Sequence, residues 1–137
     1  MAVGMLTMPD QASDAHFAVK FDANSRMVRN VIQGFWTNAV VDAYGREFKA
    51  CADMCRERTG RLNVVIDARK LPIQSRDITA RIMELDPYVA GDHVAIVLDT
   101  ALAKISARRH VDARSQTIRT EIFDSIEEAE RWLQSAR

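Results

Sequence analysis

The sequence predicts an α/β fold, a single-layer mixed, mostly parallel sheet of about five strands in the order ββαβαβαβα, with helices packed on it. Short apolar runs of strand length alternate with longer segments whose apolar residues recur every three or four positions. This alternation is typical of parallel strands joined by crossover helices. A chain of 137 residues is long enough for one core. We therefore expect one domain over residues 15–137, preceded by a flexible leader at residues 1–14.

The first two strands are expected at residues 16–21 and 27–32. Both segments alternate apolar and polar residues, and a short polar stretch joins them. This pattern predicts an antiparallel hairpin, with Asn24 suited to a left-handed position in its turn. The hairpin would leave an edge strand at which a second copy of the chain could pair, forming a homodimer.

The first helix is expected to begin at Thr37 or Asn38, either of which can cap it, and to end at Gly60. Its apolar stripe consists of Val41, Tyr44, Phe48, Cys51 and Cys55. The two cysteines share the spacing of their apolar neighbours, which indicates core thiols rather than a disulfide or a metal site. A continuous apolar run at residues 62–66 then predicts a strand that is covered on both faces.

The second half of the chain repeats the alternation. The second helix is indicated by Ile78, Ile82, Leu85 and Val89, and it should break or kink near Pro87. A buried strand is expected at residues 94–98, followed by a helix that Asp99 and Thr100 cap. This third helix carries Leu102, Ile105 and Val111.

The final strand and helix are expected over residues 117–123 and from residue 125 onward. Ser125 and Glu128 have the spacing of a capping box, the clearest helix start in the sequence. The residues expected to face inward are Ile126, Ala129, Trp132 and Leu133.

Composition excludes several classes of function. Nineteen basic residues balance nineteen acidic ones, so the net charge attracts neither nucleic acid nor an anionic membrane. The sequence shows no secretory signal and no apolar run long enough for membrane insertion, which predicts a cytoplasmic protein. Its five glycines lack the spacing of nucleotide-binding loops, and its three histidines have no companions at ligand spacing. We expect no cofactor and no metal.

Two aspartates are the candidates for chemistry. Asp67 and Asp99 each follow an apolar strand, so both should lie at the carboxyl edge of the parallel sheet, where open α/β folds bind ligands. An enzyme would need both to converge with Arg69 in a cleft. The alternative role for both aspartates is helix capping and loop hydrogen bonding.

A basic patch and an aromatic corner are the candidates for binding. The patch consists of Lys104, Arg108, Arg109, His110 and Arg114. It either complements the dipole at the end of a helix or docks an anion or phosphoprotein. Trp36 should pack at the entry to the first helix, whereas an exposed Trp36 would indicate a partner surface or the lid of a pocket.

Three segments resemble one known group of domains: VVIDARKLPIQSRD at residues 64–77, FD…SRMVRNVIQGFWT at residues 21–37, and IFDSIEEAERWL at residues 122–133. Over roughly residues 15 to 134 the chain is similar to the SpoIIAA-like group, also called STAS or STAS/SEC14-like domains. The resemblance implies a small α/β domain without cofactor or catalytic residues. The bacterial anti-sigma-factor antagonists of this group dock a kinase-like partner and are switched by phosphorylation of a serine at a helix start.

Ser75 is the residue that this resemblance marks as a switch. A serine at a helix N-terminus can place a phosphate near unpaired backbone N–H groups and the positive end of the helix dipole. The same serine can serve only as an N-cap. Both roles remain open from the sequence.

The leading hypothesis is a non-enzymatic cytoplasmic module that binds a protein partner, such as a kinase-like regulator. The residues of the expected partner or ligand face are Asp67, Arg69, Ser75, Arg76, Asp99, Lys104, Arg108 and Trp36. The alternative is a small apolar ligand or lipid carrier of SEC14-like kinship, with Met54, Met83 and Trp36 as pocket residues. An enzyme that uses Asp67 and Asp99 ranks third.

Overall fold

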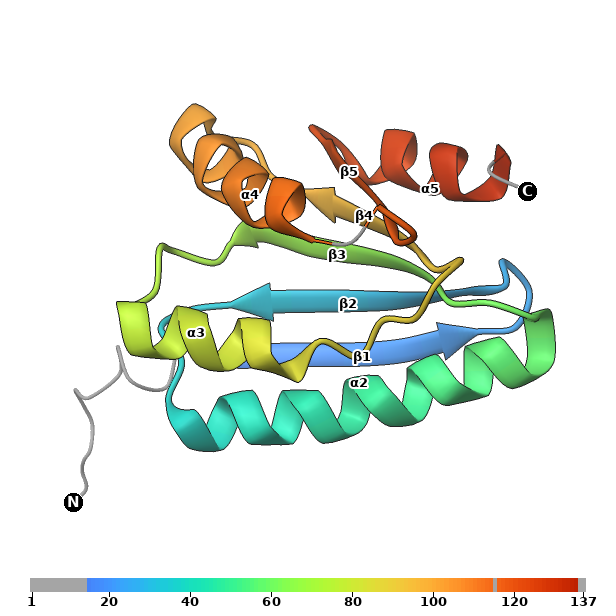
Figure 1. Ribbon diagram of the computed structural model, residues 1–137, viewed down its shortest axis with the longest axis horizontal. Coiled ribbons are helices and arrows are strands. Elements are labelled where there is room, and N and C mark those ends of the chain that lie inside the picture. The colour runs from blue at the N-terminus through green and yellow to red at the C-terminus, as the bar shows by residue number, and fades with distance from the viewer. Residues whose placement is uncertain (1–14, 115, 136–137) are drawn as a thin grey trace, which may run out of the picture.

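The computed structural model describes residues 15–114 and 116–135, so the predicted leader at residues 1–14 lies outside the described residues. Its elements follow the predicted order (Figure 1). They are β1 His16–Asp22, β2 Met27–Gln33, α2 Asn38–Thr59, β3 Asn63–Lys70, α3 Arg76–Leu85, β4 His93–Val97, α4 Ala101–Ala113, β5 Arg119–Phe123 and α5 Ile126–Ser135.

One sheet joins the five strands in the order β1-β2-β3-β4-β5. β1 and β2 pair antiparallel, and each of the other neighbouring pairs is parallel. The predicted mixed, mostly parallel sheet is therefore confirmed. β1 and β5 form the two edges of the sheet, and pairing of a second copy at the β1 edge stays a prediction.

Short polar side chains begin the helices, as the sequence predicted. Thr37, not Asn38, caps α2, because its side chain accepts a hydrogen bond from the Val40 backbone N–H. Ser75 caps α3 and Thr100 caps α4 in the same way. Gly60 ends α2 with φ of 95°, a left-handed conformation that favours glycine.

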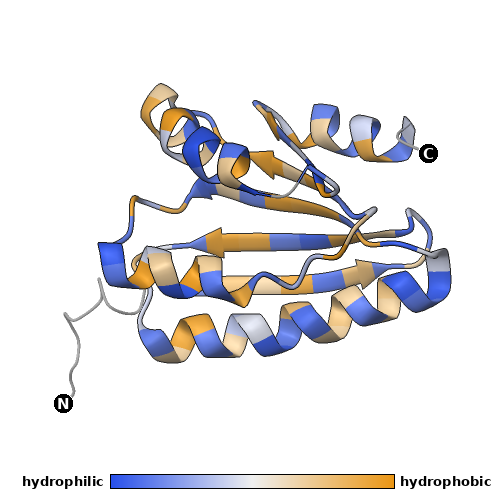
Figure 2. Ribbon diagram, viewed as in Figure 1, coloured by the Kyte–Doolittle hydropathy of each residue, from blue (hydrophilic) through white to orange (hydrophobic). Residues whose placement is uncertain are grey.

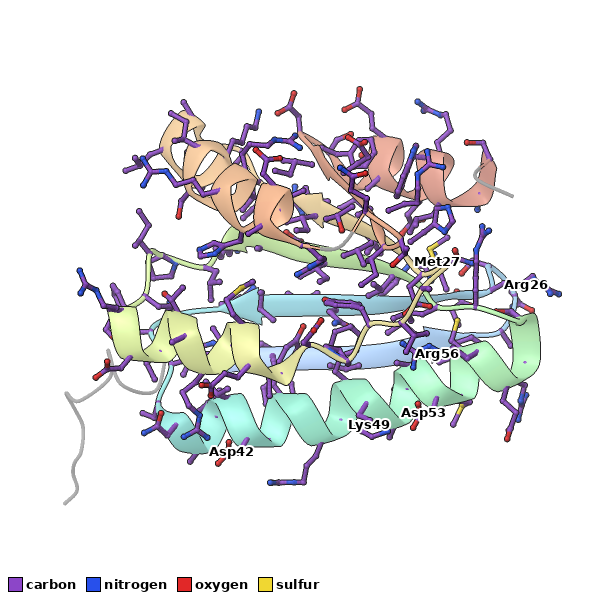
Figure 3. The ribbon with its side chains drawn as sticks, viewed as in Figure 1. Arg26, Met27, Asp42, Lys49, Asp53 and Arg56 are labelled. Atoms are coloured by element: carbon purple, nitrogen blue, oxygen red, sulfur yellow. The ribbon has the colours of Figure 1, made fainter. Side chains whose placement is uncertain are left out.

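The hairpin between β1 and β2 differs from the prediction. The left-handed residue of its turn is Arg26, with φ of 61°, and not Asn24. The Asn24 backbone N–H instead donates to the Asp22 carboxylate at 2.9 Å. The Arg26 N–H donates to the Asp22 carbonyl at 2.8 Å, so the last turn residue, which leads into β2, takes the left-handed conformation. Figure 3 shows Arg26 at this end of the hairpin.

The two faces of the sheet carry separate hydrophobic clusters. α5 covers one face, where the buried residues are Met27, Val65, Ala95, Val97, Ala129 and Leu133. α2, α3 and α4 cover the other face. Figure 2 shows hydrophobic stretches along the strands of the sheet, interrupted by hydrophilic residues. Of the three helices on this face, α2 alone contributes fully buried residues, and α3 and α4 contribute none.

α3 is fastened to α2. Arg81 of α3 forms an ion pair with Asp42 of α2. Asp42 is labelled in Figure 3. A Cβ atom added at Gly45 of α2 would lie 2.7 Å from the Leu85 side chain, so a glycine at this position lets the two helices approach closely. α3 ends at Leu85, before Pro87, which confirms the predicted break. Val89 does not continue the helix and is exposed.

The loop between α3 and β4 is held by a buried carboxylate. Asp92 is 1% exposed and forms an ion pair with Arg56 of α2 at 2.6 Å. Its carboxylate also accepts the backbone N–H groups of Leu62 and Val89. Arg56 donates to the Pro87 carbonyl at 2.6 Å as well, so one arginine ties this loop to α2 (Figure 3).

α4 turns small residues, and not Leu102 or Ile105, toward the sheet. Of the three apolar residues that the sequence indicated for this helix, Leu102 and Ile105 are 64% and 56% exposed, whereas Val111 lines the space between the helix and the sheet. Ala103 and Ala107 pack against the core instead. Within the described residues, no helix has the length and apolar character needed to cross a membrane.

Candidate ligand-binding cavity

A cavity of about 230 Å³ lies between α3, α4 and the sheet, and we call it the α3–α4 cavity. Figure 1 shows α3 and α4 apart, with strands of the sheet visible between them. The sheet side of the cavity is lined by the strand residues Ile32, Ile66, Ala68 and Ile96 and by Leu98, which follows β4. α3 lines it with Thr79, Ile82, Met83 and Leu85. Side chains of α2, α4 and the loops next to α2 and α3 line the rest of the cavity.

The small residues of α4 explain why this space is open. Ala103, Ser106 and Ala107 face the cavity, at spacings of three and four that place them on one side of the helix. Leu102 and Ile105 would fill the space if α4 were rotated, but they point to solvent. α3 cannot close the gap while it remains fastened to α2. The cavity therefore follows from which side α4 turns inward and from where α3 is anchored.

Four aromatic rings form one wall. Trp36 packs edge-on against Tyr44 at 5.1 Å between ring centroids, Tyr44 packs against Phe48, and Phe48 packs against Tyr88. All four rings line the cavity. Burial raises the pKa of Tyr44 well above its ordinary range and raises the pKa of Tyr88 to about 12, so both phenols stay neutral at physiological pH.

Trp36 is only 5% exposed, so it is not the partner surface that we considered. Its indole N–H donates to the Gln33 carbonyl at 2.7 Å, as expected for a packed corner at the entry to α2. Its neighbour Phe35 is the exposed member of the pair. Trp36 and Met83 both line the α3–α4 cavity, whereas Met54, the third expected pocket residue, is exposed on α2 and does not.

Gln74 uses its polar atoms to hold the loop before α3. Its side-chain oxygen accepts the Trp36 backbone N–H at 2.8 Å. Its side-chain nitrogen donates to the carbonyls of Gly34 and Pro72, at 3.0 and 2.8 Å. Gln74 therefore fixes one end of the cavity and has little capacity left to bind a ligand.

Arg114 and Tyr88 form the opposite end. The Arg114 guanidinium lies 4.5 Å from the centre of the Tyr88 ring, a distance typical of a cation–π contact. The same guanidinium donates to the Thr120 hydroxyl at 3.3 Å. His110 of α4 also lines the cavity near this end. These residues place positive charge beside an otherwise apolar space.

Asp67, Arg69 and Asp99 line a second, separate depression of about 300 Å³ at the carboxyl edge of the sheet. Asp67 pairs with Arg69 at 2.8 Å, and this hydrogen bond keeps the pKa of Asp67 below its ordinary value. The three residues on which the enzyme hypothesis depends therefore line one depression. Ser75 does not line this depression. An enzyme built on the two aspartates stays a prediction.

Ser75 acts as the N-cap of α3, since its hydroxyl accepts the Ile78 backbone N–H at 3.2 Å. It and Arg76 are both exposed. Lys104 and Arg108 line another depression, between α4 and α5, where Lys104 pairs with Asp124. The predicted partner face thus spans several distinct surface regions rather than a single cleft.

The cysteines and histidines among the described residues form neither a disulfide nor a metal-binding cluster. Cys51 and Cys55 are free thiols, and Cys55 is fully buried in the core, as predicted. In residues 15–114 and 116–135, no group of three or more histidine, cysteine or acidic side chains could hold a metal ion.

The sequence did not single out the small α4 residues that line the cavity. No site role was proposed for Ala103, Ser106 or Ala107, because small residues within a helix have few groups that react or bind. A usable signal was present, since these three small residues recur at helical spacing on one side of the helix. Such a stripe indicates close packing or open space, and the sequence alone does not distinguish the two.

Comparison with known proteins identifies the fold. No family model matches the sequence, and no curated protein matches it. Among solved structures, the chain is similar to an uncharacterised DUF3478-family protein with a SpoIIAA-like fold from Shewanella loihica PV-4, with a TM-score of 0.68 and 14% sequence identity. The similarity covers 87% of this chain and 94% of the other. The resemblance noted in the sequence is thus borne out at the level of architecture, and the protein has a SpoIIAA-like fold.

Proposed function

We propose that this protein binds a small apolar ligand in the α3–α4 cavity and acts as a non-enzymatic carrier or sensor of that ligand in the cytoplasm. One observation supports the proposal above the others, namely the apolar cavity that the inward alanine and serine residues of α4 leave open. Ligand sites are generally apolar spaces with a few polar groups, and this cavity has that composition. The geometry thus favours the carrier hypothesis over the protein-partner hypothesis that led from the sequence.

The volume limits the size of the ligand. A dry apolar cavity of ~150 Å³ is enough to hold benzene. Sites for drug-sized molecules usually measure ~300–1,000 Å³. A cavity of about 230 Å³ lies between these limits and suits a compact ligand with a short chain or a single ring system. The chains of a two-chain lipid exceed this volume.

Trp36 provides a direct reporter of binding. It lines the cavity, whereas Trp132, the other tryptophan, packs against the cluster on the α5 face. In a Trp132→Phe background, fluorescence therefore reports on Trp36 alone. We expect titration with octan-1-ol to change this fluorescence and to saturate.

A substitution that fills the cavity tests the location. Ala107→Leu adds an isopropyl group to the lining and should abolish the octan-1-ol response while the protein remains folded. Ala101→Leu is the matched control, because Ala101 is an exposed residue of the same helix and does not line the cavity. Equal binding by both variants would rule out this site. Mass spectrometry of an extract from denatured protein would identify a co-purified natural ligand.

A second candidate is a protein-docking module, and the exposed apolar residues near α4 support it. Ile73, Leu102 and Ile105 are each more than half exposed, and Ile73 and Leu102 line one shallow depression. Ser75 begins the neighbouring helix and is exposed. If this surface docks a regulator controlled by phosphorylation, Ser75→Asp should change the amount of partner retained in pull-downs. Unchanged retention would remove the switch.

A further inference from the structure

The polar side chains that line the α3–α4 cavity differ in how many of their hydrogen-bonding groups are already used within the protein. Gln74, at one end, uses its amide oxygen and nitrogen in hydrogen bonds to the backbone. At the other end, Ser106, His110 and Arg114 lie four residues apart along α4 and its C-cap, and all three line the cavity. Residues four apart are neighbours on one side of a helix. The α4 side of the cavity therefore presents a row of polar groups that ends in a permanent cation.

Among the described residues, Arg114 is held in place without a carboxylate partner. Its guanidinium rests on the Tyr88 ring at 4.5 Å and donates one hydrogen bond, at 3.3 Å, to Thr120. Tyr88 is itself packed edge-on against Phe48 at 5.8 Å, so the ring that supports the guanidinium is fixed from behind. A guanidinium has five N–H donors, so these contacts leave donors that a ligand can use.

The acidic groups nearby do not neutralise this charge. Asp86 is the acidic residue that lines the cavity, and it is exposed. Within residues 15–114 and 116–135, no aspartate or glutamate lies within 4 Å of the Arg114 guanidinium nitrogens. By contrast, Arg29, Arg56, Arg69 and Arg81 each form an ion pair with an acidic side chain. Arg114 thus lacks at the cavity the partner that these arginines have elsewhere.

We propose that the ligand of the α3–α4 cavity is a medium-chain carboxylate, with its apolar chain between α3 and α4 and its carboxylate paired with Arg114. This inference rests on the proposed function and adds the chemical class of the ligand to it. A planar guanidinium and a carboxylate form two parallel hydrogen bonds, which a hydroxyl or an ammonium group cannot reproduce. His110 and Ser106 lie along the same row and offer further polar contacts to the head group.

The chain length follows from the volume. If a cavity of ~150 Å³ holds the six carbons of benzene, then scaling to about 230 Å³ gives a ligand of roughly nine carbons. Octanoate is therefore a suitable probe, and octan-1-ol and octylamine are matched probes with the same chain and a neutral or cationic head. All three can be titrated against the Trp132→Phe protein with Trp36 fluorescence as the readout.

We expect octanoate to bind about tenfold more tightly than octan-1-ol, and octylamine to bind most weakly. The expected ratio reflects a hydrogen bond between charged groups, which is stronger than one between neutral groups. Arg114→Gln should remove the preference by reducing octanoate affinity to the level of octan-1-ol. Arg109→Gln is the matched control, since Arg109 is an exposed basic residue of α4 that does not line the cavity, and it should keep the preference.

The outcomes separate this inference from the function on which it rests. Binding of octan-1-ol by Arg114→Gln with unchanged affinity would show that the variant keeps its cavity, so that loss of octanoate preference reflects the charge. Equal affinity for the acid and the alcohol in the unsubstituted protein would overturn the carboxylate assignment and leave the cavity as an apolar site. Retention of the preference by Arg114→Gln would also overturn it. Absence of binding by all three probes would overturn both proposals.

Discussion

The two faces of the sheet are built from similar residues but packed in different ways. On one face, the single helix α5 seals a cluster in which Val65, Ala95 and Val97 are at most 2% exposed. On the other face, three helices cover the sheet, yet α3 and α4 contain no fully buried residue and leave a cavity of about 230 Å³. α2 is the exception on that face, because its inward residues are buried.

The difference in packing between the two faces indicates which helices stabilise the fold and which form the binding site. Packed apolar surface stabilises a fold roughly in proportion to the area removed from water, and α2 and α5 each contribute fully buried residues to the core. A helix that leaves a cavity gives up part of this stabilisation, and it does so at a place where a ligand can replace the missing contacts. We infer that α2 and α5 maintain the fold and that α3 and α4 serve the site.

The largest expected effect compares one large apolar residue from each region. Leu133→Ala on α5 removes a side chain that is 2% exposed and should lower the free energy of unfolding by about 2–5 kcal/mol. Ile82→Ala on α3 removes a partly buried side chain beside an existing cavity and should cost about 1–2 kcal/mol. Urea denaturation of both variants measures the two costs.

These two costs test the comparison directly. A similar loss of stability in the two variants would mean that α3 is packed as tightly as α5 and that the two faces do not differ. The slope of the free energy against urea concentration should stay constant, because neither substitution changes the surface exposed on complete unfolding by much.

A smaller effect compares two helix caps of the same chemistry. Ser125 accepts the Glu128 backbone N–H and Ser75 accepts the Ile78 backbone N–H, each at 3.2 Å. Replacing either serine with alanine should cost its helix about 1 kcal/mol. Because α5 is sealed into the core, Ser125→Ala should reduce the stability of the whole domain. Because α3 buries no residue fully, Ser75→Ala should act mainly on local opening of α3.

Native-state hydrogen exchange distinguishes local from global opening. In Ser75→Ala we expect faster exchange of the α3 amides, with little change in the amides of β3 and β4. In Ser125→Ala the slowest core amides should exchange faster as well. An equal effect of the two substitutions on core amides would show that α3 unfolds only together with the rest of the domain.

The sequence was sufficient for features that depend on local chemistry. Helix starts at Thr37, Ser75 and Thr100 and the helix end at Gly60 could be predicted, because a cap needs only its own side chain or conformation and the next turn of backbone. The order of the elements was predictable for a related reason. The alternation of strand and helix periodicity directly reflects which side of each element is buried.

The orientation of α4 could not be predicted from periodicity. Apolar residues occur on more than one side of this helix, and it is Ala103 and Ala107, not the larger Leu102 and Ile105, that pack against the core. The turn before β2 failed for a different reason. Asparagine is the commoner left-handed residue, but the Asn24 backbone N–H is held by the Asp22 carboxylate and the left-handed position falls at Arg26.

The cavity could not be predicted from the sequence, because it depends on three features that involve segments far apart in the chain. α3 must be fastened to α2 at Gly45 and Asp42, α4 must turn its alanines inward, and Arg114 must rest on Tyr88. Each contact joins segments far apart in the sequence. The convergence of Asp67 with Asp99 was predictable by contrast, since adjacent parallel strands place their carboxyl ends at one edge.

The smallest expected effect concerns His93, which tests how completely the α5 face excludes water. His93 is 8% exposed and its ring packs against Trp132 at 5.6 Å. Burial, reinforced by the positive charge of Arg61, lowers the pKa of His93 below its ordinary value of about 6.5. The unfolded chain therefore takes up the proton more readily than the folded protein. Stability should be unaffected above about pH 6.5 and should fall as the pH decreases from there through the lower pKa of the folded state.

This loss cannot exceed one proton, or about 1.4 kcal/mol per pH unit. His93→Gln should remove that part of the pH dependence, whereas His16→Gln, at an exposed position, should retain it. The measurement is the free energy of unfolding in urea at several pH values between 5 and 7.5. If the slope is the same in both variants, protonated His93 is solvated in the folded protein. In that case water reaches the α5 face, and the contrast between the two faces is weaker than their burial indicates.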